Sequence, residues 1–158
     1  LSVFSKRAKR RLVSHPKFYY FDVGVFRTLR PKGPLDSPEE IDGAALETLI
    51  LQELIAINDY YQLEYQIYYW RTSNGVEVDF ILYGPRGIVA LEVKRSKNIK
   101  GKDLRGLQAF LGDYPEAKAF LIFGGNVPEY HNDIAAIPLE HFFKKSTILL
   151  FVIQLLMK

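Results

Sequence analysis

The spacing of apolar and polar positions predicts two main helices and five strands in this chain of 158 residues. The helices are expected at 43–58 and at about 102–111, and the strands at 64–71, 76–83, 88–94, 117–123 and 134–138. Asn74-Gly75 is a strong signal for a hairpin between the first two strands, and Gly84–Gly87 has turn chemistry between the next two. The order α-βββ-α-β-β predicts an α/β (α+β) fold with a mixed central sheet flanked by helices.

Shorter patterns predict the remaining elements and the domain limits. Lys17–Asp22 has the aromatic content of a short strand, Gly24–Leu29 is expected to be a brief helix, and Leu139–Lys145 to begin another. Ser37-Pro38 also has the chemistry of a helix start. We therefore expect three parts, namely a basic linker over 1–16, a folded domain over 17–145 and an apolar tail over 146–158.

Composition narrows the chemistry that is possible. The net charge is +3 and the pI is near 9.0, which permits an anionic partner without requiring one. The absence of Cys excludes thiol catalysis and cysteine zinc sites, and it is compatible with a cytoplasmic location. The tail segment Ile148–Met157 is too short to cross a bilayer core of about 30 Å as a helix. It could instead be a buried last element, or a surface for a partner or for a second copy in a homo-oligomer.

Two acidic side chains are predicted to face each other inside the sheet. The strand Ile88–Val93 is apolar on successive residues, so both of its faces are expected to be covered, yet it contains Glu92 and is followed by Lys94. If Tyr83 pairs with Ile88 across the turn, Asp79 lies opposite Glu92, with Cβ atoms about 4.5–5.5 Å apart. A divalent cation would remove the repulsion between them. The same register puts Lys94 opposite Glu77, so an ordinary salt bridge is the alternative.

A third carboxylate comes from the first main helix. At 100° per residue, Glu47 lies in the middle of the apolar stripe formed by Ile50, Leu51 and Leu54. A carboxylate that faces the core needs a partner. A metal site at the sheet would supply one, and a buried salt bridge to Arg71 is the alternative.

A helix Glu, an Asp on one strand and Glu-x-Lys on the next resemble the PD-(D/E)xK nuclease-like superfamily, which has a restriction-endonuclease-like αβββαβ core. More narrowly, the chain is similar to the C-terminal domain of bacterial and archaeal AAA-type ATPases described only as ATP-binding proteins. The similar stretches are Tyr20–Val25, Gly43–Glu47, Tyr69–Thr72, Glu77–Leu82 and Leu91–Lys94. In these proteins an ATPase module precedes the domain, and no Walker A loop occurs in this chain.

The resemblance implies a Mg²⁺- or Mn²⁺-dependent nuclease acting on nucleic acid, with DNA as the expected substrate. It implies that Asp79 and Glu92 bind the metal, Glu47 is an accessory ligand, Lys94 orients the attacking water, and Gln108 lies near the site. Val78 stands where the superfamily motif usually has Pro, which weakens the match.

Basic residues could hold the nucleic acid, although Lys and Arg are ordinary on protein surfaces. The candidates are Arg71, Arg95, Lys97, Lys100 and Lys102, and the cluster Lys6–Arg11 could also contact phosphate if it is not a solvated linker. The competing hypothesis is a catalytically silent nuclease-like domain that serves recognition or assembly.

Overall fold

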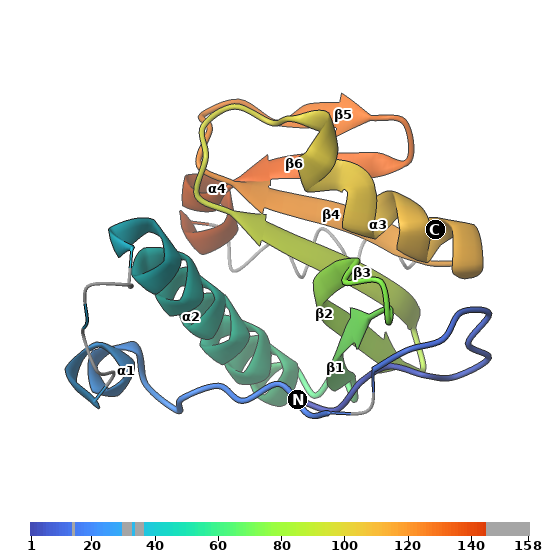
Figure 1. Cartoon of the computed structure of the whole chain (residues 1–158), viewed down its shortest axis with the longest axis horizontal. Coiled ribbons are helices and arrows are strands. Elements are labelled where there is room, and N and C mark those ends of the chain that lie inside the picture. The colour runs from blue at the N-terminus through green and yellow to red at the C-terminus, as the bar shows by residue number, and fades with distance from the viewer. Residues whose placement is uncertain (14, 30–32, 34–36, 145–158) are drawn as a thin grey trace.

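The computed structural model describes residues 1–13, 15–29, 33 and 37–144 (Figure 1). Its helices are α1 (Val23–Leu29), α2 (Pro38–Tyr60), α3 (Gly101–Asp113) and α4 (Leu139–Lys144). Its strands are β1 (Gln66–Arg71), β2 (Glu77–Gly84), β3 (Gly87–Lys94), β4 (Lys118–Phe123), β5 (Glu129–His131) and β6 (Ile134–Pro138). The predicted tail over 146–158, and the homo-oligomer contact suggested for it, lie outside the described residues.

All six strands form one mixed sheet in the order β1-β2-β3-β4-β6-β5. Strands β1, β2 and β3 are antiparallel, β4 and β6 run parallel to β3, and β5 returns antiparallel to β6. The predicted mixed sheet flanked by helices is confirmed. So is the register across the second turn, where Tyr83 pairs with Ile88. Strand β5 was not predicted, because three residues are too short to show a period.

The sheet lies between two helical layers, and each of its faces has its own core (Figure 1). Helices α2 and α4 pack on one face, and the residues least accessible there include Ile50, Leu54, Phe80, Leu82 and Ile122. Helix α3 packs on the other, where the least accessible include Phe4, Trp70, Leu107, Phe110 and Leu121. Burial on both faces explains why the central strands are apolar on successive residues.

Helix α2 begins earlier than the apolar pattern alone predicts. The Ser37 hydroxyl accepts a hydrogen bond from the backbone N–H of Glu40 at 3.1 Å, and Pro38 occupies the first turn, where its missing N–H costs nothing. The start predicted at Ser37 and the main helix predicted at Gly43 therefore belong to one helix.

The N-terminal segment covers the free edge of β1. Residues 2–4 exchange backbone hydrogen bonds with Tyr69, Val13 donates to the Arg71 carbonyl, and Phe4 is only 1% exposed. The strand predicted over Lys17–Asp22 is wrong, because the chain there makes no strand pairing and the free edge of β1 is already taken by these earlier residues. The predicted linker is thus packed in part, while its basic cluster Lys6–Arg11 is exposed.

No helix in the described part of the chain has both the length and the apolar character needed to span a membrane.

Candidate functional site

An irregularity in β2 sets the position of Asp79. Strands β1 and β2 pair regularly at Tyr68–Ile81 and again at Trp70–Val78. Between these two pairs, Tyr69 of β1 faces two residues of β2, Asp79 and Phe80. In a regular strand Val78 and Phe80 would share a face, yet they belong to the cores on opposite faces. This is a β-bulge, a feature that redirects side chains and is common beside active sites.

Asp79 and Glu92 meet where β2 and β3 stop pairing, beyond the pair Phe80–Leu91. Each carboxylate accepts a backbone N–H from the opposite strand: Asp79 N–H donates to Glu92 Oε2 at 3.3 Å, and Val93 N–H donates to Asp79 Oδ2 at 2.9 Å. The two side chains therefore lie across from each other, as the register predicted.

Both carboxyl groups are buried, Asp79 with 5% and Glu92 with 7% of its surface exposed. Burial raises the pKa of Asp79 to about 6, and the charge of Glu47 adds to this effect. Burial together with the charge of Asp79 raises the pKa of Glu92 to about 8. The two groups therefore resist carrying negative charge together unless a cation joins them.

Lys94 extends from the end of β3 and donates to Glu92 Oε1 at 2.6 Å. The alternative salt bridge to Glu77 is not formed, because the β2–β3 pairing ends before that position. Burial alone would lower the pKa of Lys94, but the charges of Glu92 and Asp79 outweigh it and raise the pKa. Lys94 is therefore a cation held against one of the buried carboxylates.

Glu47 reaches the same place from α2. It lies on the stretch of α2 that carries the buried Ile50, Leu51 and Leu54, and its own side chain is 25% exposed. Its cationic partner is Lys17, with Nζ at 3.0 Å from Oε2, rather than Arg71. The Tyr19 hydroxyl also donates to Oε2 at 3.3 Å.

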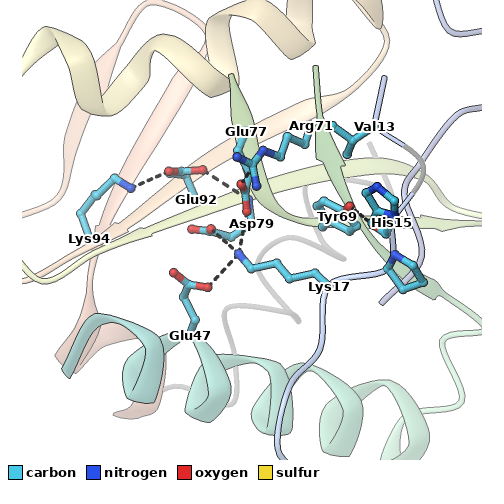
Figure 2. A pocket seen from close by; sticks show the side chains of 11 residues that line it. Val13, His15, Lys17, Glu47, Tyr69, Arg71, Glu77, Asp79, Glu92 and Lys94 are labelled. Atoms are coloured by element: carbon cyan, nitrogen blue, oxygen red, sulfur yellow. Dashed lines mark hydrogen bonds and ion pairs between the residues drawn. The ribbon is translucent and has the colours of Figure 1, made fainter. Parts of the chain in front are cut away.

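Lys17 is the site residue that the sequence did not reveal. Its Nζ lies 2.6 Å from Glu77 Oε1, 3.0 Å from Glu47 and 3.5 Å from Asp79 Oδ1 (Figure 2). Burial would lower its pKa, but the charges of Asp79 and Glu47 and the hydrogen bond to Glu77 more than reverse this and raise it. The apolar pattern placed Lys17 at the start of a strand, and nothing near it in the sequence indicates carboxylate partners.

These groups line one cavity of about 740 Å³. Figure 2 shows Glu47 entering from α2, Lys17 from the N-terminal segment, and Asp79 and Glu92 from the sheet. The lining residues are Val13, His15, Pro16, Lys17, Glu47, Tyr69, Arg71, Glu77, Asp79, Glu92 and Lys94. Arg71 lies 3.6 Å from Glu77, so the acidic centre has cationic groups at its border.

Other candidates from the sequence lie away from the cavity. Gln108 is exposed on α3 and does not line it. The basic candidates that follow β3 are also exposed and outside the lining; they are Arg95, Lys97, Lys100 and Lys102. Arg95 forms an exposed ion pair with Asp42 at 2.8 Å. Among the predicted nucleic-acid contacts, Arg71 alone lines the cavity.

The donor set suits a hard divalent cation in its chemistry, because carboxylate oxygens are the ligands such ions prefer. Three carboxylates from α2 and β2 already converge on a single positive charge, which is the Lys17 ammonium. Within the described ranges, no group of three or more His, Cys, Asp or Glu side chains is arranged to hold a metal ion. The carboxylates have the oxygen atoms that a divalent ion prefers, but they are gathered around an ammonium group.

Comparison with known proteins gives a family without an assigned activity. No curated protein and no solved structure matches the chain. One family model matches residues 42–142, which is more than half of the chain and includes Glu47, Asp79, Glu92 and Lys94. The chain therefore belongs to the family described as Domain of unknown function (DUF4143).

Proposed function

We propose that this domain is a divalent-metal-dependent phosphodiesterase that hydrolyses nucleic acid, with DNA as the expected substrate. The observation that carries the proposal is the meeting of Glu47, Asp79, Glu92 and Lys94 in one cavity. The carboxyl groups of Asp79 and Glu92 are buried and have raised pKa values, and Lys94 pairs with Glu92. Perturbed titratable groups converging in a cavity are characteristic of functional sites.

The resemblance to the PD-(D/E)xK superfamily supports the same proposal. The helix Glu, the strand Asp and the Glu-x-Lys come from α2, β2 and β3, and the order α-βββ-α-β matches the expected core. The covalent link to an AAA-type ATPase module is likewise a proposal, which rests on the resemblance alone.

In this mechanism Asp79 and Glu92 would hold Mg²⁺ or Mn²⁺, with Glu47 as an accessory ligand. The bound ion would neutralise developing negative charge and lower the pKa of water. In the metal-free site the charges of Glu92 and Asp79 raise the pKa of Lys94, so Lys94 is protonated there and can donate to an anionic phosphate oxygen or orient the water. The backbone N–H groups of Asp79 and Val93 fix the carboxylates in place.

Nucleic acid would approach over the cationic border of the cavity. Arg71, which is half exposed on β1, can pair with a phosphate beside the site. The exposed side chains of Arg95, Lys97, Lys100 and Lys102 can contact more distant phosphates. Gln108 has no position in this mechanism, since it does not line the cavity.

A second candidate function is recognition without cleavage. Lys17 and Lys94 already form ion pairs with the four carboxylates that line the cavity, so these charges have partners without a metal. The four carboxylates are Glu47, Glu77, Asp79 and Glu92. A silent domain of this kind would bind nucleic acid or protein and leave the substrate intact.

Hydrolysis assays separate the two candidates. Supercoiled plasmid and a single-stranded oligonucleotide are incubated with the protein and Mg²⁺ or Mn²⁺, using the wild type, Asp79→Asn and Lys94→Met. Lys144→Met is the matched control, because Lys144 forms an exposed ion pair with Glu140 outside the cavity. The catalytic proposal predicts cleavage by the wild type and control only. Binding of nucleic acid with no cleavage by any folded sample would favour recognition.

A further inference from the structure

Lys17 occupies the centre of the acidic site as its counter-cation. Its ammonium contacts Glu47 from α2 and both Glu77 and Asp79 from β2, all within 3.5 Å. Lys94 pairs with the fourth carboxylate, Glu92, on the far side of Asp79 (Figure 2). The positive charge that these acids need is therefore supplied by the chain itself.

An ammonium and a divalent cation compete for these carboxylates, because both are positively charged and both need their oxygens. Mg²⁺ requires oxygen ligands at about 2.0–2.1 Å in near-octahedral geometry. The Lys17 nitrogen lies 3.0 Å from Glu47 and 3.5 Å from Asp79, so it lies within the space between two of the proposed ligands. A metal that draws Glu47 and Asp79 together would be repelled by the ammonium.

We propose that Lys17 is a built-in competitor of the divalent cation, holding the site closed to metal until its ammonium withdraws. The inference rests on the proposed function, since it concerns the ion used there. It gives Lys17 a regulatory role. Lys17 lies outside the helix-and-strand motif that carries the resemblance, and it precedes the region that the family model matches.

Withdrawal requires movement of the side chain and leaves the backbone around it anchored. The Lys17 N–H donates to the Leu1 carbonyl at 2.8 Å, and Val13 N–H donates to the Arg71 carbonyl at 3.1 Å. Further along, the Gln52 side chain donates to the Phe21 carbonyl. The Lys17 side chain is 27% exposed, so its flexible stem has a path to solvent.

The size of the effect follows from population arithmetic. If the withdrawn state accounts for between about 0.1% and 10% of the molecules, apparent metal affinity is weakened by about 10- to 1,000-fold. Removing the ammonium should therefore tighten metal binding at least about tenfold.

The test measures Mn²⁺ binding by calorimetry, with circular dichroism confirming that each sample is folded. Lys17→Met removes the charge and keeps much of the stem, while Lys17→Gln offers amide donors to the same carboxylates in case the first variant does not fold. Lys144→Met makes the same change of net charge at an exposed ion pair. In wild-type protein, an amine-reactive label located by mass spectrometry reports whether Lys17 is released.

The proposal expects tighter Mn²⁺ binding in both Lys17 variants, no change in Lys144→Met, and more labelling of Lys17 when Mn²⁺ is added. Unchanged, weaker or absent Mn²⁺ binding in a folded Lys17 variant would overturn it. Failure of the proposed function is distinguishable, because tighter Mn²⁺ binding without hydrolysis would refute the nuclease and leave the competition intact. Hydrolysis by the wild type, together with an unchanged Mn²⁺ affinity in the Lys17 variants, would support the nuclease and refute the competition.

Discussion

The carboxyl pair in β2 and β3 makes folding stability depend on pH in an unusual direction. Most paired carboxylates have lowered pKa values, and their contribution is lost as the pH falls. Here burial raises the pKa of Glu92 to about 8 and that of Asp79 to about 6. The native protein therefore binds more protons than the unfolded chain between about pH 4 and pH 8, and its stability falls as the pH rises through this range.

The magnitude follows from the raised pKa values. Each factor of ten in the acid constant corresponds to about 1.4 kcal/mol. For Glu92 this gives a loss on the order of 3 kcal/mol between about pH 5 and pH 8, with Asp79 adding less because the two titrate together. The pKa values of Lys17 and Lys94 are raised, so both remain charged in this window and their contribution is lost only at higher pH.

Glu92→Gln is the decisive perturbation, since it keeps the side-chain shape and removes the titration. We expect the variant to lose far less stability than the wild type between about pH 5 and pH 8, a difference on the order of 3 kcal/mol. Lys94 loses its partner in this variant, but that cost is constant across the range because the ordinary pKa of a lysine, about 10.4, lies well above pH 8.

Urea unfolding at several pH values measures the effect. The single tryptophan, Trp70, is fully buried and supplies the fluorescence signal. Wild-type stability that rises or stays level over this range, or a Glu92→Gln variant with the same slope as the wild type, would contradict a raised pKa for Glu92. Saturating Mg²⁺ should also flatten the wild-type slope if the ion binds the ionised pair.

Three further predictions test other parts of the structure. Lys94→Met should lower the rate of phosphodiester hydrolysis at least about 100-fold while calorimetry still detects metal binding; equal loss of both would give Lys94 a structural role. Gly106→Ala should destabilise the fold in urea unfolding, because its Cβ would lie 2.1 Å from the Glu77 carbonyl oxygen, whereas Gly43→Ala, with nothing within 4 Å, should be neutral or stabilising. Leu54→Ala should cost about 2–5 kcal/mol of unfolding free energy, since Leu54 is fully buried between α2 and the sheet, and a cost below about 1 kcal/mol would contradict that packing.

The layout of the sheet and the meeting of Asp79 with Glu92 could be predicted from local signals. The turn at Gly84–Gly87 sets the pairing of β2 with β3, and the register then follows residue by residue up to Phe80. The position of Glu47 followed from helical periodicity alone.

The bulge and the lysine could not be predicted in this way. The bulge at Asp79 and Phe80 contains no glycine, and it arises from how β1 pairs with β2 rather than from a residue signature. The place of Lys17 depends on the path of the N-terminal segment along β1, which is set by scattered pairings and by burial of Phe4. Long-range contacts of this kind leave no local periodicity.

The most direct test of the central claim is a calorimetric titration of Mn²⁺ into the wild type and Asp79→Asn. We expect a binding heat in the wild type that disappears in the folded variant, because Asp79 is a proposed ligand whose carboxylate contacts Lys17 and whose backbone N–H holds Glu92. The same binding heat in both proteins would place the metal elsewhere and contradict the account.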